Sequence, residues 1–136
     1  METKQTSAET IVNFISLVQE TYNQFTIWHW NSQGNIHVVT EEIYKSLFDA
    51  MDSLIESYIS FSGRLYVKTF SAGISTEFTE DRLVKLCTGI IDQANKICEG
   101  ITDEGFKGQI SEIITIMRIA VYKLGPRASS EETSEG

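Results

Sequence analysis

The apolar residues between positions 36 and 65 constrain the fold most, because they recur with the period of an α-helix along the whole stretch. Together they cover roughly half of the helical circumference, which is wider than a surface helix needs. We therefore expect one stripe to face the core of the chain and the other to face a partner subunit. The first stripe comprises Ile36, Val39, Ile43, Leu47, Met51, Leu54, Tyr58, Phe61 and Leu65, and the second comprises Tyr44, Phe48, Ile55 and Ile59.

Three further stretches have the same period. A first helix is predicted over about 7–30, a third after an N-cap at Thr79, and a fourth that Gly125 and Pro126 should end. Residues 64–78 lack a sustained period and are expected to form a crossover loop. This pattern predicts an all-α, ferritin-like four-helix bundle with a long crossover between helices 2 and 3. The apolar series are Ile11, Ile15, Val18, Tyr22 and Phe25; Leu83, Cys87, Ile90, Ala94, Ile97 and Ile101; and Phe106, Ile110, Ile114, Met117, Val121 and Leu124.

The length of 136 residues indicates one domain, which we place at 1–126, followed by a disordered acidic tail over 127–136. Cys87 and Cys98 lie too far apart along one helix for a disulfide, and both are expected to be reduced and buried. The chain has neither an apolar secretory segment near residue 1 nor a run long enough to span a membrane. We therefore expect a cytoplasmic protein.

Both histidines of the chain flank a predicted helix–helix corner, the segment NSQGN over 31–35. Gly34 is free to take a positive φ, and Asn35 is the predicted N-cap of the second helix. His29 continues the apolar series of the first helix, and His37 lies near the start of the second. A lone histidine is more often a core residue bonded to a carbonyl. The surrounding residues favour metal ligation here, by non-haem iron, manganese or zinc.

Asp52 and Glu56 are spaced i, i+4 and so share one face of the second helix. They lie roughly 22 and 28 Å beyond His37 at 1.5 Å rise per residue. One straight helix cannot bring these carboxylates and His37 to one ion. A two-fold dimer with antiparallel second helices brings them together, because such an interface presents the same patch twice.

The segments HWNSQG, IHVVTEEIY and MDSLIES resemble the Dps family of mini-ferritins. The resemblance implies a ferroxidase centre at a dimer interface, with His29 and His37 from one subunit and Asp52 and Glu56 from its mate. It further implies oxidation of Fe(II) by hydrogen peroxide or O₂, ferric iron storage in a dodecameric cage, and protection against oxidative stress. The segment between the histidines is shorter than in that family. Trp30 would lie next to the iron or pack the helix end. Glu41 and Tyr44 are weaker candidates that would support the ligands, and for each of them a position in the core or on the solvated surface is the favoured interpretation.

The net charge of −8 argues against nucleic-acid binding through a basic surface, so DNA binding is expected to be weak or absent. A second interpretation stays open beside the ferroxidase. The chain would then be a Dps-like structural or assembly protein with a degenerate metal site and no enzymatic activity.

Overall fold

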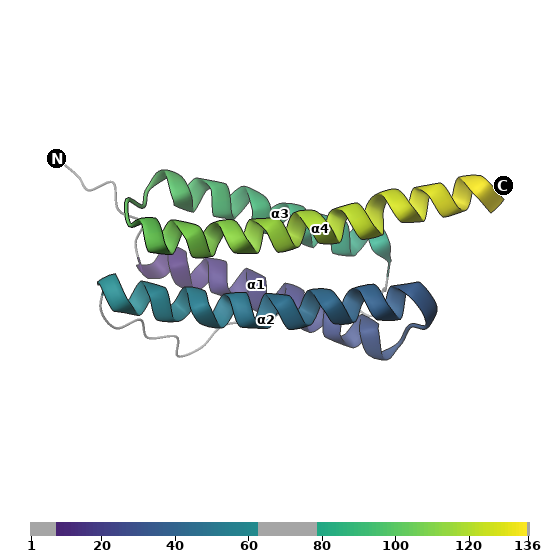
Figure 1. The fold of residues 1–136 in the computed structure, drawn as a ribbon, viewed down its shortest axis with the longest axis horizontal. Helices are drawn as coiled ribbons and strands as arrows, with labels where there is room; N and C mark the ends of the chain where they lie inside the picture. The colour runs from purple at the N-terminus through teal and green to yellow at the C-terminus, as the bar shows by residue number, and fades with distance from the viewer. Residues whose placement is uncertain (1–7, 63–78, 136) are drawn as a thin grey trace.

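The computed structural model describes the backbone of residues 8–62 and 79–135, and the side chains of residues 8–60 and 79–124. These residues form four α-helices and no strand (Figure 1). The helices are α1 (Ala8–Trp30), α2 (Gly34–Ser62), α3 (Glu80–Glu99) and α4 (Glu104–Glu135). The predicted all-α four-helix bundle is confirmed. The predicted crossover, 64–78, lies outside the described residues.

The four helices pack as a square in which every neighbouring pair is antiparallel. α1 packs on α2 and α3, and α4 packs on the same two helices. Figure 1 shows α1 and α4 running in one direction and α2 and α3 running in the other. Consequently α2 ends at one end of the bundle, and α3 begins at the opposite end, beside the α1–α2 corner.

The core contains the apolar series of all four helices. From the first stripe of α2, the residues from Val39 to Tyr58 are buried and Ile36 is half-buried. The second stripe is covered only in part, because Phe48 keeps 48% of its surface exposed and Tyr44 is half-buried. Like Tyr44, Ile55 and Ile59 are half-buried against the core. The four helices therefore leave an apolar strip of α2 open along its length.

Two predicted helix boundaries are wrong. α2 begins at Gly34, so Asn35 lies in its first turn and is not the residue that precedes it. α4 continues to Glu135, through Gly125 and Pro126, and the backbone of 127–135 is helical. Proline removes one helical N–H, but its φ fits a helix, so it weakens α4 there without ending it.

The start of α3 is as predicted. The Thr79 hydroxyl accepts a hydrogen bond from the Arg82 backbone N–H at 3.2 Å, which is the N-cap interaction. Asp103 does the same for α4, where its carboxylate accepts from the Phe106 N–H at 2.9 Å. These caps fix where the third and fourth helices begin.

Both cysteines are free, as predicted: Cys87 is buried and Cys98 is half-buried. Within residues 8–62 and 79–135, none of the helices combines the length and apolar character that a membrane span requires.

Candidate metal centre

The corner between α1 and α2 places the two histidines on facing helices. Gly34 turns the chain with a φ of 68°, the left-handed conformation that glycine adopts without a steric penalty. The end of α1 is capped by two side chains. Asn31 Nδ2 donates to the Ile27 carbonyl at 2.8 Å, and Ser32 Oγ donates to the Trp28 carbonyl at 2.7 Å. These bonds reach carbonyls in the last turn of α1, and the Trp28 carbonyl also accepts from the Asn31 backbone N–H at 3.0 Å.

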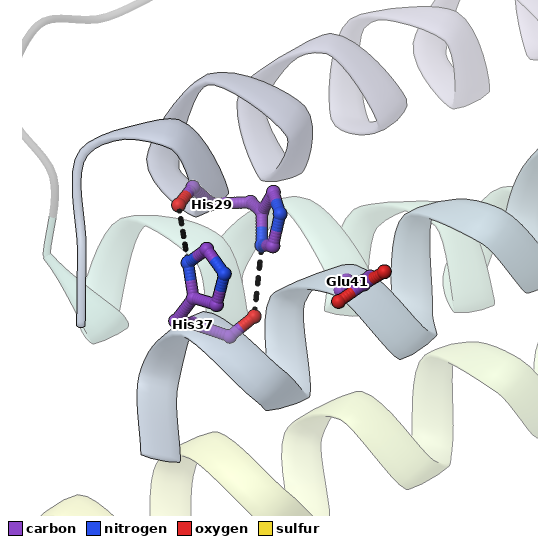
Figure 2. Close-up of side chains that lie close together, drawn as sticks. All are labelled: His29, His37 and Glu41. Atoms are coloured by element: carbon purple, nitrogen blue, oxygen red, sulfur yellow. Dashed lines mark hydrogen bonds between the residues drawn. The ribbon is translucent and has the colours of Figure 1, made fainter. Parts of the chain in front are cut away.

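His29 and His37 exchange hydrogen bonds with each other's backbone. His29 Nδ1 lies 2.8 Å from the His37 carbonyl oxygen, and His37 Nδ1 lies 2.9 Å from the His29 carbonyl oxygen (Figure 2). The two rings stack with their centroids 3.8 Å apart. This reciprocal pair ties the last turn of α1 to the first turns of α2.

The carbonyl partners determine which ring nitrogen each histidine presents. A carbonyl oxygen only accepts, so Nδ1 of each imidazole must carry the proton. In the neutral ring the lone pair then lies on Nε2, the nitrogen left for a metal ion. Histidines that bind metals commonly donate their second ring nitrogen to a carbonyl in this way, which fixes both tautomer and orientation. The geometry thus prepares two imidazole ligands.

Glu41 completes the cluster from one turn further along α2 (Figure 2). One ring nitrogen of each histidine and one Glu41 carboxylate oxygen lie within 4.8 Å of one another. Ligand atoms on one transition-metal ion, at about 2.1 Å from it, lie roughly 3–4 Å apart, so the separations in this cluster are close to those of ligands that share an ion. Two imidazoles and one carboxylate are a donor set used by non-haem Fe(II) and by zinc. The residues fit such an ion.

The surroundings of the pair are partly polar and well supported. His29 is only 8% exposed, and its ring meets the Tyr44 ring in an edge-type contact with centroids 5.4 Å apart. Thr40 is fully buried, and its hydroxyl donates to the Ile36 carbonyl at 2.7 Å and lies 3.1 Å from the His37 carbonyl. The carbonyl that holds the His29 ring is therefore itself held in place. Tyr44 supports the ring of His29 directly, and Thr40 supports it through this carbonyl.

Glu41 carries the charge of the cluster. Lys45 donates a hydrogen bond to its carboxylate at 2.7 Å, and this bond and the lysine's charge lower the pKa of Glu41 below its ordinary value. Glu41 is therefore ionised at neutral pH, as a ligand must be.

The other candidate residues lie apart from this cluster. Asp52 and Glu56 are exposed on α2. Since α2 is one uninterrupted helix, they lie roughly 22 and 28 Å beyond His37, as the sequence indicated. The tryptophans have different environments, because Trp28 is buried in the core and Trp30 is 70% exposed.

Sequence reasoning ranked Glu41 only among weak supporting groups, whereas the structure makes it a candidate ligand. The available signal was its spacing: Glu41 follows His37 by four residues, so the two share one face of a helix. Among the described residues, no second group of three potential ligands gathers in this way.

The chain belongs to a protein family of unknown function, DUF5856, whose model matches residues 29–124. The match begins at His29 and includes every residue of the candidate centre. No curated protein and no solved structure gives a significant match to the chain.

Proposed function

We propose that this protein is a Dps-like member of the ferritin-like superfamily that binds Fe(II) and oxidises it with hydrogen peroxide or O₂. The observation that carries the proposal is the reciprocal His29–His37 pair with Glu41 beside it. A histidine that only filled the core would need one hydrogen-bonding partner. Here backbone carbonyls hold two rings in place, and one nitrogen of each ring lies within 4.8 Å of one carboxylate oxygen, an arrangement that suits a transition-metal ion.

The direction of the helices supports the ferritin-like part of the proposal. α2 and α3 run the same way, and α2 ends at the end of the bundle opposite to the start of α3. The end of α2 and the start of α3 therefore lie at opposite ends of the bundle. One long connection between the second and third helices distinguishes ferritin-like bundles from simple up-and-down bundles.

Three donors leave coordination positions open, and a second subunit can supply further ones. We propose a homodimer in which Asp52 and Glu56 of the mate complete the centre, within a larger cage. The exposed acid pair and the partly open apolar strip of α2 support this arrangement. The acids and the strip lie on one side of the same helix, so one antiparallel contact uses both.

Fe(II) is the substrate in this reaction. Hydrogen peroxide takes one electron from each of two Fe(II) ions, takes up protons and is reduced to water, and the ferric product is stored. The chain contributes neutral imidazoles that need no change of tautomer, and an ionised carboxylate. Trp30 directly follows His29 in the chain and is exposed, and the ring of Tyr44 packs against the ring of His29.

An assembly protein with a degenerate metal site is the alternative function. The observation that favours it is that the cluster found among the described residues has only three donors, His29, His37 and Glu41, and does not include Asp52 or Glu56. In that case the chain would still form the dimer and the larger shell.

Oxidation of Fe(II) by defined variants tests the proposal. Wild-type protein receives Fe(II) anaerobically, then peroxide, and ferric absorbance is followed. We expect His37→Ala and Glu41→Gln to lower the initial rate by about ten-fold or more, since each removes a ligand. The matched control is Glu42→Gln, because Glu42 is exposed and paired with Lys123 at 2.9 Å. It should oxidise at the wild-type rate.

Two results would contradict the ferroxidase. Either wild-type protein oxidises iron no faster than buffer, or the ligand variants match the Glu42→Gln control. Both results leave the assembly protein as the function.

A further inference from the structure

We propose that Lys45 is a built-in competitor for the metal centre, which holds the Glu41 carboxylate until a metal ion displaces it. The inference rests on the proposed function, because it concerns control of the same His29–His37–Glu41 cluster.

The Lys45 ammonium group is already bound to the Glu41 carboxylate. Its Nζ atom lies 2.7 Å from Glu41 Oε2, which makes a hydrogen-bonded ion pair. Glutamate four residues before lysine is the favoured order of such a pair on a helix. Glu41 is also the only carboxylate of the cluster. An incoming ion must therefore take this oxygen from Lys45 or share the carboxylate with it.

The Lys45–Glu41 ion pair is exposed to solvent and is therefore weak. The Lys45 side chain is 63% exposed and that of Glu41 is 39% exposed. Pairs this accessible to water contribute little, because solvent screens the charges and the lysine stem loses freedom when it is held. A divalent ion has twice the charge of the ammonium group and also gains two imidazole ligands. Metal binding therefore displaces Lys45 without disturbing the core.

A second acceptor for Lys45 lies one turn further along α2. Asp49 follows it by four residues and is exposed. Tyr22, Tyr44, Lys45, Phe48 and Asp49 together line a groove of about 240 Å³. When Glu41 turns to the metal, the lysine stem reaches over this groove towards Asp49. Glu41, Lys45 and Asp49 thus form a row in which one cation exchanges between two carboxylates.

The consequence is a raised threshold for metal loading. Lys45 lowers affinity in two ways: it competes for the Glu41 oxygen, and its charge repels the ion at short range. Removal of the charge should therefore strengthen metal binding by about two- to five-fold, the range expected for one exposed ion pair.

Titration with Co(II), followed by its visible absorption under anaerobic conditions, measures this effect without any oxidation step. We expect Lys45→Gln to bind Co(II) about two- to five-fold more tightly than wild type. Lys45→Arg, which keeps the charge, should bind no more tightly than wild type. The control is Lys85→Gln on α3, because Lys85 pairs with Asp81 at the same spacing, at 3.3 Å. Its affinity should equal that of the wild type.

The dependence on salt and a double variant test whether Lys45 weakens Co(II) binding by competing for Glu41. Rising ionic strength screens Lys45, so the advantage of Lys45→Gln should shrink as salt increases. Asp49→Asn should weaken binding in the wild-type background and have no effect in the Lys45→Gln background, because Asp49 acts only by receiving the lysine. If Asp49 merely attracted cations, both backgrounds would weaken equally.

The outcomes for this inference and for the proposed function differ. If wild-type protein binds Co(II) and Lys45→Gln binds it equally or more weakly, the competitor role is wrong and the metal centre stands. If neither protein binds Co(II), both fail. If only Lys45→Gln binds it, Lys45 blocks the centre completely and the inference holds in its strongest form.

Discussion

At the scale of single residues, the two histidines and the two cysteines differ in how well they can bind a metal ion. The carbonyls of His29 and His37 each hold the proton of the other ring, so both imidazoles are kept ready for an ion. Cys87 is fully buried among apolar residues, and this burial raises the pKa of its thiol to about 12. Cys98 is half-buried, and its thiol pKa is also raised by burial. The thiols are therefore poor ligands in the folded chain, because only a thiolate binds metals well.

This state of the thiols predicts their reactivity. A disulfide reagent at pH 8 should modify Cys98 slowly and Cys87 only after unfolding, since attack needs an accessible thiolate. Mass spectrometry of the native and the unfolded protein identifies which residue is modified. Rapid modification of Cys87 in the native protein would contradict its burial.

The same thiol also gives a pH dependence with a defined sign. In the unfolded chain Cys87 ionises near 9.0, whereas the folded chain holds its proton to about 12. Its contribution to stability is complete below pH 9 and is lost between pH 9 and 12, at about 1.4 kcal/mol per pH unit. Urea unfolding at pH 8 and pH 10 should show a steeper alkaline loss for wild type than for Cys87→Ala.

At the scale of elements, most of what the sequence predicted depends on local rules. The Thr79 cap, the positive φ of Gly34 and the buried faces of α3 and α4 each follow from a few neighbouring residues, and each was predictable. The two wrong boundaries are places where local rules compete. Proline often ends a helix, but α4 continues through Pro126 to Glu135. Asparagine often precedes a helix as its N-cap, but α2 already begins at Gly34, one residue before Asn35.

Two glycine substitutions test how the corner is formed. Gly34 has a φ of 68° and open space where a Cβ would lie, so Gly34→Ala should cost about 1–2 kcal/mol through backbone strain alone. Gly89 also has open space, but lies inside α3 with an ordinary φ, so Gly89→Ala should stabilise by about 0.5–1 kcal/mol. Denaturant unfolding measures both. Equal effects of the same sign would show that strain at the corner is not the cause.

At the scale of the whole molecule, the sequence indicated the bundle but only part of the candidate centre. Periodicity shows which face of a helix is apolar, and it placed His29 towards the core. It contains no information on which ring nitrogen faces which carbonyl, because that depends on how α1 meets α2 across the turn. For this reason the reciprocal hydrogen bonds, and the role of Glu41 beside them, became visible only in the structure.

The open strip of α2 leads to a prediction about assembly. We expect wild-type protein to be a dimer or a larger assembly by light scattering, and Phe48→Glu to break it, because a charge replaces a half-exposed ring in the proposed contact. The matched control is Ile119→Glu on α4, where the native residue is 43% exposed. It should leave the mass unchanged. A monomeric wild type would rule out the shared centre.

Phe48→Glu should still bind Co(II), because His29, His37 and Glu41 come from one chain. Binding that disappears together with assembly would show that the mate is needed even for the first ion. Retained binding with lost oxidation would assign the mate's acids to the reaction itself.

The unbroken α2 helix fixes the distance and the angle between His37 and the acid pair Asp52 and Glu56. Asp52 lies fifteen positions after His37 on one continuous helix. One residue inserted between them would shift the acids by about 1.5 Å and swing them by about 100° around the helix axis. The imidazoles would stay as they are, while the carboxylates would aim elsewhere. In the proposed dimer, the number of residues between the two sets is therefore as important as their identity.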